Sequence, residues 1–203
     1  MPWYRKYGKI LTPLTDDDFQ KGMEHGQFIK EEHRAYPVLL YYSCVRKTEG
    51  LRATTENFNI TSNSLIFDVG PRLKKLRHKQ KGIKLTEDQY TELLKKRKAQ
   101  LSTPPLPLPI DAPYMDYLVE AIEDTEKGKA VFDYSPKTAY NIVARAFKYP
   151  HLFRLSRITN FFLEGWTVPQ VRSWTGLSLA ALNYYIGIVD IQKMGDSLNK
   201  NRE

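Results

Sequence analysis

The stretch between residues 151 and 185 constrains the fold more than any other part of the sequence. Apolar residues recur in it at helical spacing, and Gly165 and Gly176 interrupt the pattern. Because glycine commonly ends helices, the stretch predicts three consecutive helices, over residues 152–163, over residues 167–174 and from about residue 178 onward. The side chains expected in the core of this segment are Phe161, Leu163, Val168, Val171 and Trp174.

The rest of the chain predicts further helices and a small sheet. The helical patterns cover residues 15–25, 27–43, about 46–55, 86–98, 111–126 and 135–147. Pro37 either kinks the second of these helices or marks its start. Residues 64–69 are strand-like, and the proline-rich residues 104–109 predict a return strand at a sheet edge. The expected fold class is therefore mainly α with a small antiparallel β-sheet or hairpin (α+β).

The length of 203 residues suits one domain with a sizeable core. We expect residues 1–195 to form that single domain and residues 196–203 to be a flexible tail. Residues 71–100 are strongly basic at first and then mixed in charge, which predicts a hairpin-and-helix insertion within the domain.

Charge and cysteine content limit the partners and the compartment. The chain holds 31 Lys and Arg against 23 Asp and Glu, a net charge of +8, which favours a nucleic acid over a membrane as partner. Cys44 is the single cysteine, so neither an internal disulfide nor a cysteine-only zinc site can form. Neither a signal peptide nor an apolar stretch of membrane-spanning length is evident in the sequence. We therefore expect a cytoplasmic protein without membrane association.

Two segments far apart in the sequence carry side chains suited to a phosphodiester. Residues 40–49 read Leu-Tyr-Tyr-Ser-Cys-Val-Arg-Lys-Thr-Glu and include Arg46. His151 is followed by Arg154, a spacing that places both side chains on one face of a helix. A guanidinium is always charged and forks onto two phosphate oxygens, a histidine moves protons, and a phenol is a nucleophile when cations surround its target.

Together these segments resemble the motifs of the tyrosine recombinases of the phage integrase type. Residues 40–49 are similar to the family's first-arginine box, apolar-Tyr-Tyr-Thr-Gly-Leu-Arg-x-x-Glu, and His151-x-x-Arg154 is similar to its His-x-x-Arg box. Tyr184 and Tyr185 follow at a distance inside the range that the family shows. The resemblance covers about residues 12–190, and the order and spacing of the boxes are more specific than either box alone.

A second match to the first-arginine box lies close by. Gly50-Leu51-Arg52 fits the family's tripeptide Gly-Leu-Arg, but Arg52 lacks the preceding tyrosine pair and an acid three residues later. We therefore expect Arg46 to be the first arginine.

The resemblance implies the catalytic domain of a site-specific DNA recombinase or integrase, of the kind found in prokaryotic or viral mobile elements. Such an enzyme cuts and rejoins double-stranded DNA through a 3′-phosphotyrosyl intermediate, and neither a metal nor another cofactor is expected. The family's N-terminal core-binding domain is expected to be absent, because the boxes begin within the first fifty residues. Family members act as tetramers on two duplexes, and a monomer is the alternative here.

The resemblance also assigns roles to individual residues. The implied catalytic residues are Arg46, His151, Arg154, one of Lys74 and Lys75, and one of Tyr184 and Tyr185. Neighbouring residues on a helix point about 100° apart, so one tyrosine faces the site while the other packs. We favour Tyr185 as the nucleophile and leave Tyr184 open.

One departure from the family concerns the position after Gly176. Leu177 stands where the family usually has a histidine, or occasionally a tryptophan, that donates a hydrogen bond to the phosphate, and leucine has no donor. We expect Trp174 or Ser178 to donate the hydrogen bond to the phosphate instead. Glu49 is expected to be a further supporting residue of the site. Losing one such donor costs on the order of 10²-fold in rate, so weak activity and inactivity both remain open.

Basic residues of the insertion are expected to bind the DNA backbone and to add affinity rather than sequence choice. The predicted DNA-binding residues are Arg72, Lys74, Lys75, Arg77, Lys79, Lys81, Lys84 and Arg157.

Other interpretations of the same residues stay open. Arg46 is alternatively a surface arginine paired with Glu49, and both tyrosines are alternatively packing residues. At the level of function, the alternatives are a catalytically weakened or inactive DNA-binding relative and a helix-turn-helix regulator that uses residues 152–174.

Overall fold

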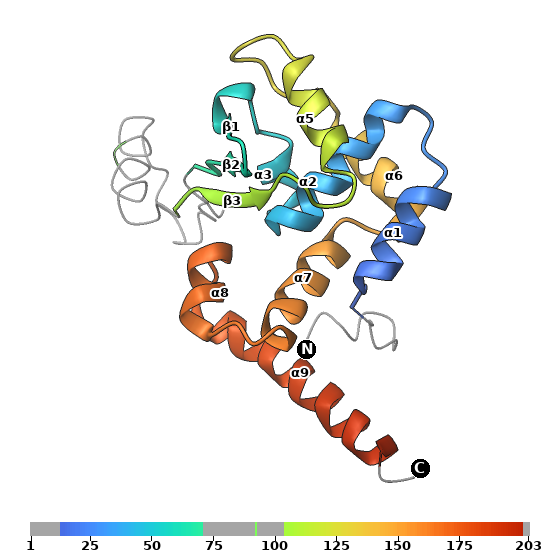
Figure 1. The fold of residues 1–203 in the computed structure, drawn as a ribbon, viewed down its shortest axis with the longest axis vertical. Coiled ribbons are helices and arrows are strands. Elements are labelled where there is room, and N and C mark those ends of the chain that lie inside the picture. Colours follow the sequence, from blue (N-terminus) through green and yellow to red (C-terminus); the bar gives the residue numbers. More distant parts are fainter. Residues whose placement is uncertain (1–12, 71–91, 93–103, 201–203) are drawn as a thin grey trace, which may run out of the picture.

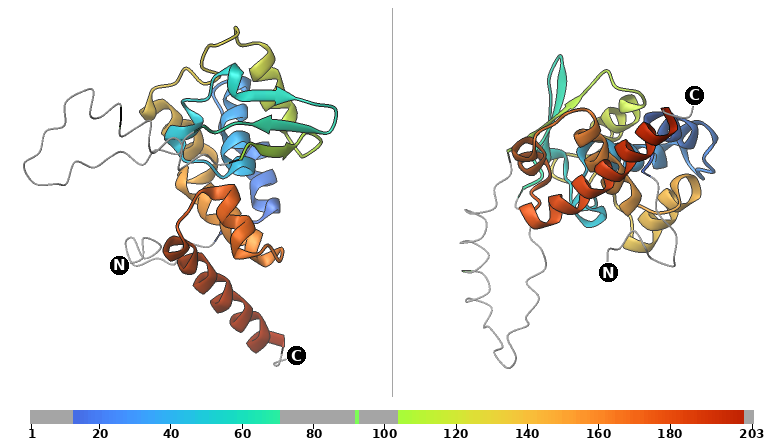
Figure 2. Two further views of the ribbon diagram at one scale, coloured as in Figure 1. Left: turned by 90° about the vertical axis from the view of Figure 1, so that its left-hand side faces the viewer. Right: turned by 90° about the horizontal axis from the view of Figure 1, so that it is seen from below.

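Helices surround a small antiparallel sheet (Figures 1 and 2). This computed structural model describes residues 13–70, 92 and 104–200. Its elements are α1 (Asp16–His25), η2 (Glu31–Arg34), α2 (Ala35–Ser43), α3 (Lys47–Gly50), η3 (Thr55–Asn57), β1 (Phe58–Ile60), β2 (Ser64–Phe67), β3 (Leu106–Pro109), α5 (Met115–Glu123), α6 (Pro136–Phe147), α7 (His151–Leu163), α8 (Val168–Thr175) and α9 (Leu179–Lys200). The predicted α+β class is confirmed.

Helix α2 runs through the middle of the molecule and is buried along almost its whole length. It contacts α5, α6, α7 and β3. Its residues are apolar on every side, and a helix of that kind is stable only when other elements cover all of its faces. The burial of α2 fixes the position of its C-terminal end, where Cys44 and Arg46 follow.

The sheet has the strand order β1-β2-β3, with both neighbouring pairs antiparallel. Leu65 pairs with Leu108 and Phe67 pairs with Leu106, and all four side chains are buried. The prolines that alternate with the leucines of β3 are exposed, as expected for an edge strand that needs few N–H donors. The predicted strand at 64–69 and its return strand are confirmed, whereas β1 was not predicted.

Two hydrophobic clusters fill the interior, and α7 lies between them. The first cluster joins α1, α2, the sheet, α5 and α6, and it includes Phe153 of α7. The second cluster joins α7, α8 and α9 and includes Leu155, Tyr185 and the thiol of Cys44. Because residues of α7 face both clusters, this helix holds the two parts of the molecule together.

Local capping signals explain where several helices begin and end. The Thr15 side chain accepts a hydrogen bond from the Asp18 N–H at the start of α1, and Ser135 does the same for Thr138 at the start of α6. Gly176 ends α8 with a φ of 61°, a left-handed conformation that glycine adopts without strain. The predicted helices at 15–25, 135–147, 152–163 and 167–174 are confirmed within one or two residues.

Three predicted helices differ from the structure. The segment 27–43 is not one helix, because η2 precedes α2 and Pro37 is the third residue of α2, where its missing N–H has no helical acceptor. The short helix after Arg46 ends at Gly50 rather than near residue 55. Helix α5 begins only at Met115, after a left-handed Tyr114, and is shorter than 111–126.

Two further expectations concern the C-terminal part. Leu163 is 45% exposed, so its predicted place in the core is wrong; it is the last residue of α7 and faces solvent there. Helix α9 continues past residue 196, where the sequence predicts the tail to begin, and carries the chain away from the body (Figure 1). Apart from Glu92, the predicted insertion at 71–100 lies outside the described residues.

Candidate active site

Arg46 lies between two helices whose ends fix its backbone. Cys44 ends α2 in a left-handed conformation with a φ of 58°, and its N–H donates to the Leu40 carbonyl. Arg46 then precedes α3, and its N–H donates to a Glu49 carboxylate oxygen at 2.7 Å. The Arg46 Nη1 donates to the other Glu49 oxygen at 2.5 Å. Glu49 therefore holds Arg46 at both its backbone and its side chain, and the alternative prediction that Arg46 pairs with Glu49 is confirmed.

Arg52, the competing first arginine, is exposed. Arg46, in contrast, follows Cys44 by two residues, and the Cys44 carbonyl accepts a hydrogen bond from Arg154. The backbone that leads to Arg46 is therefore in contact with another predicted site residue.

Arg154 is the buried cation of the site. It lies on α7 and is only 2% exposed. Its Nη1 donates to the carbonyl of Cys44, and its Nη2 donates to the carbonyl of Thr175 at 3.0 Å. These two bonds join the end of α2 and the end of α8 to the first half of α7. Backbone carbonyls thus orient the guanidinium, and no carboxylate of the described residues forms an ion pair with it.

A buried charge without a counter-ion is unusual. Removing a guanidinium from water costs several kcal/mol, roughly, unless an opposite charge or strong hydrogen bonds offset the loss. The carbonyl dipoles at Cys44 and Thr175 offset part of that cost but carry no net charge. An anion that approaches Arg154 therefore meets a fixed cation whose orientation is set before binding.

His151 begins α7, one helical turn before Arg154, and its side chain is exposed. Partial loss of hydration lowers the pKa of His151, and the positive charges of Arg154 and Arg46 lower it further. The neutral imidazole, which accepts a proton, is thereby favoured near pH 7.

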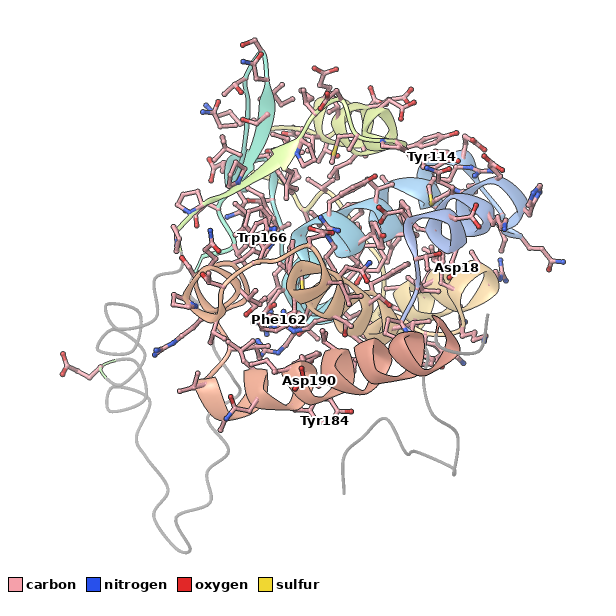
Figure 3. The ribbon with its side chains drawn as sticks, turned by 60° about the horizontal axis from the view of Figure 1, so that its bottom comes forward. Asp18, Tyr114, Phe162, Trp166, Tyr184 and Asp190 are labelled. Atoms are coloured by element: carbon pink, nitrogen blue, oxygen red, sulfur yellow. The ribbon has the colours of Figure 1, made fainter. Side chains whose placement is uncertain are left out.

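Tyr185 lies on α9 in the second cluster and is 5% exposed. Burial raises the pKa of Tyr185 to about 12, although the charges of Arg154 and Arg46 act in the opposite direction. The same two guanidinium groups therefore act on both His151 and Tyr185. Helix α9, which carries the labelled Tyr184 and Asp190, lies alongside α7, which carries the labelled Phe162 (Figure 3), and it also contacts α8. This packing brings residue 185 within the electrostatic reach of residues 46 and 154, which are remote in sequence.

The two neighbouring tyrosines differ in their surroundings. No described residue forms a hydrogen bond with the Tyr185 hydroxyl. The positive charges of both arginines act to lower the pKa of this side chain. Tyr184 is half-buried and packs against Tyr185 at an interplanar angle of 82°. The charges of Arg154 and Arg46 act on Tyr185, and the choice of Tyr185 over Tyr184 as the nucleophile stays a prediction.

The predicted substitutes for the missing donor serve structural roles. Trp174 packs its ring against Phe161 and Trp166, with centroids 5.7 Å and 5.6 Å away. Ser178 is exposed, and its carbonyl accepts from the N–H groups that open α9. Leu177 is half-buried in the second cluster. A role for Trp174 or Ser178 at a phosphate stays a prediction.

The predicted DNA-binding residues are only partly described. Arg157 is neutralised by Glu164 at 2.8 Å and stacks over the Phe161 ring at 4.6 Å. Its contacts are structural, so a contact with DNA remains a prediction. Both candidate lysines, Lys74 and Lys75, lie outside the described residues with the other basic residues of the insertion.

The carbonyl groups of Cys44 and Thr175 are the site elements that the sequence did not reveal. Backbone acceptors leave no signature in side-chain identity. The nearest signal was Gly176, which predicts the end of α8 and hence a free carbonyl one residue earlier.

Neither a metal-binding cluster nor a membrane-spanning helix is present in residues 13–70, 92 and 104–200. These residues contain no group of three or more His, Cys, Asp and Glu side chains arranged to hold a metal ion. None of their helices combines the length and the apolar character needed to cross a membrane.

No protein-family model matches the sequence, and no curated protein matches it either.

Proposed function

We propose that the chain is the catalytic domain of a tyrosine-type DNA strand transferase, a recombinase or integrase. The observation that carries the proposal is that the charges of Arg46 and Arg154 act on both His151 and Tyr185, with Arg154 bonded to the carbonyl of Cys44, two residues before Arg46. These residue types are the ones that the family resemblance predicted. Double-stranded DNA is the proposed partner, which places the activity inside a cell, and a tetramer on DNA is the proposed assembly.

The proposed reaction needs only groups of the protein and the DNA. The Tyr185 hydroxyl oxygen attacks the phosphorus and gives up its proton as the bond to the 5′ oxygen breaks. Neutral His151 accepts that proton, since its lowered pKa favours the acceptor form. Arg154 and Arg46 stabilise the charge on the phosphate oxygens. The leaving 5′ oxygen takes a proton from Lys74 or Lys75, and the attack of a 5′ hydroxyl on the phosphotyrosine reverses the step.

The raised pKa of Tyr185 fits a site that is incomplete without DNA. A buried phenol with a pKa of about 12 is a poor nucleophile. In this mechanism the phosphate binds first, and proton transfer to His151 accompanies the attack, so that no free phenolate is needed.

The test uses the full chain and a nicked suicide substrate, from which the released strand diffuses away. Wild-type protein is expected to form a covalent protein–DNA adduct, seen as a band that survives denaturation. Tyr185→Phe is expected to abolish the adduct. Tyr184→Phe is the matched control and is expected to keep it. Adducts that persist in Tyr185→Phe and disappear in Tyr184→Phe would assign the nucleophile to Tyr184.

The second candidate function is a DNA-binding relative without strand-transfer activity, which the lack of a donor at Leu177 favours. It predicts salt-dependent binding to duplex DNA without an adduct on any substrate. Leu177→His separates weak from absent activity, because a restored donor is expected to raise adduct formation by on the order of 10²-fold in a weakened enzyme.

A further inference from the structure

A hollow of about 520 Å³ lies between α1 and the junction of α6 and α7, and its lining includes none of the side chains of the candidate active site. Its apolar part is formed by Leu14, Ala146, Phe147 and Leu152. Its charged part is formed by Asp18, Lys21, His25, Arg145 and Lys148, and we call the whole the basic cavity. Asp18, labelled in Figure 3, marks the α1 side.

The cations of the basic cavity outweigh its one carboxylate. Lys21 pairs with Asp17 at 2.6 Å. Asp18 accepts hydrogen bonds from the backbone and side chain of Thr15, and these bonds, followed by the charges of Lys21 and Lys148, lower the pKa of Asp18. Neither Arg145 nor Lys148 pairs with a carboxylate of the described residues. Two cations without an ion pair thus line one hollow and favour an anionic ligand.

Lys148 has a strained backbone at the edge of this cavity. Its φ of 69° and ψ of −53° form a γ-turn closed by the Tyr149 N–H and the Phe147 carbonyl at 2.8 Å. This γ-turn is the rare, strained type, and a non-glycine residue at its centre is rarer still. Strain of this kind persists where the surroundings hold it, and it clusters at ligand sites. Here it sets the direction of the Lys148 side chain.

The wall of the basic cavity is closely packed. Helix α1 approaches α6 through two glycines. A Cβ at Gly22 would lie 2.1 Å from Phe147, and a Cβ at Gly26 would lie 2.6 Å from Ala146. Since neither position has room for a side chain, the two glycines allow α1 and α6 to pack closely at this wall. A wall that is already packed needs little ordering on binding, which lowers the entropy cost of binding.

We propose that the basic cavity binds a phosphoryl group on a sugar or nucleoside, with Arg145 and Lys148 on the phosphate and the apolar part under the remainder. The volume suits a ligand of nucleotide size. Arg145 supplies a fork for two oxygens, and Lys148 supplies a point charge. The phosphate source is a free nucleotide or a DNA strand, and the proposal does not depend on the proposed strand transfer.

The first experiment is isothermal titration of the full chain with 5′-dAMP at low salt. Arg145→Ala combined with Lys148→Ala is expected to weaken binding at least about tenfold, because two charge-assisted hydrogen bonds are lost. Lys127→Ala combined with Lys129→Ala removes the same charge outside the cavity and is the matched control. Equal weakening in both pairs, or no weakening in either, would overturn the proposal.

Two further variants test the strained turn and the location of the bound nucleotide. Lys148→Gly removes the cation and relieves the strained turn, so a raised melting temperature together with weaker dAMP binding is expected. A lowered melting temperature would contradict the strain. Binding that survives Arg145→Ala/Lys148→Ala but is lost in Arg46→Ala would place the nucleotide at the candidate active site instead and would overturn the proposal.

Competition separates the two phosphate sources. A short blunt duplex that displaces dAMP from wild-type protein assigns the basic cavity to DNA phosphates. Binding of dAMP that is unaffected by the duplex assigns it to a free nucleotide. Because no step of this assay requires an adduct, its failure and the failure of strand transfer are observed separately.

Discussion

The first and second clusters use similar apolar helix faces but enclose different polar groups. The first cluster contains stacked aromatic rings, such as Phe19 on Tyr41 with centroids 3.9 Å apart. The second cluster is smaller and surrounds Tyr185 and the buried guanidinium of Arg154. Apolar packing stabilises both, but only the second encloses a cation without a carboxylate partner among the described residues. One region therefore supports the fold, while the other accepts an electrostatic cost that suits anion binding.

The largest expected effect is on the stability of the first cluster. Phe19 is 1% exposed and lies between the rings of Tyr41 and Phe147. Phe19→Ala is expected to lower the free energy of unfolding by about 3–5 kcal/mol, because it leaves a cavity among rings. Urea denaturation measures this change. Ile29→Ala, at a side chain that is 66% exposed, is the control and is expected to stay within about 0.5 kcal/mol. Similar losses in both variants would show that the first cluster does not dominate stability.

Arg154→Gln tests the second cluster and is expected to affect activity more than stability. The variant keeps a donor for one carbonyl but loses the charge, so adduct formation is expected to fall by at least about 10²-fold. The free energy of unfolding is expected to fall by about 1–3 kcal/mol, because a buried carbonyl loses its donor. Adduct rates and urea denaturation measure the two effects.

The matched control for Arg154→Gln lies beside the first cluster. Like Arg154, Arg34 donates to a backbone carbonyl, but Glu31 already neutralises it at 2.9 Å. Arg34→Gln is therefore expected to leave adduct rates within about tenfold of wild type. An equal loss of adducts in both variants would show that general charge, rather than the buried guanidinium, drives the reaction.

The smallest expected effect compares one histidine from each region. His33 is 9% exposed and packs on Tyr134 beside the first cluster, and burial lowers its pKa. Partial loss of hydration lowers the pKa of His151, and the charges of two arginines lower it further. NMR titration is expected to find both pKa values below their ordinary value of 6.5. Duplex DNA is expected to raise the pKa of His151, because phosphates offset the arginines, and to leave that of His33 unchanged.

The same two histidines predict the sign of a pH effect on stability. Because their pKa values are lower in the folded chain, the unfolded chain binds more protons once the pH falls below about 6.5. Stability is therefore expected to decrease as the pH drops through this range, which melting temperatures measured between about pH 8 and pH 5 would show. His151→Asn is expected to reduce the decrease, and a steeper decrease in that variant would contradict the assigned direction.

Much of the local structure follows directly from short stretches of sequence. Thr15, Ser135 and Gly176 mark helix ends because a cap hydrogen bond or a left-handed residue is a local requirement. The alternating leucines and prolines of β3 likewise show which face of an edge strand is buried. These signals depend on a few neighbouring residues, so the predicted helices and strands that carry them are observed in the structure.

Predictions failed where distant elements decide the outcome. The span 27–43 divides into η2 and α2, and Leu163 is exposed, because each result depends on which element covers the segment. Periodicity reports that a face is apolar but not what lies against it. The basic cavity was not predicted, because its cations come from α1 and from the turn between α6 and α7, which are distant in the sequence.

The assembly of the candidate site depended on packing between remote helices. The sequence pointed to Arg46, His151, Arg154 and a tyrosine, but it left open which tyrosine faces the site and whether Arg46 pairs with Glu49. Packing of α7 against the end of α2 brings the Arg154 guanidinium to the Cys44 carbonyl. Burial of Tyr185 in the second cluster leaves its hydroxyl within reach of the charges of both arginines. Side-chain identity sets which chemistry is available, whereas the distance between charged groups is set only when the helices that carry them pack together.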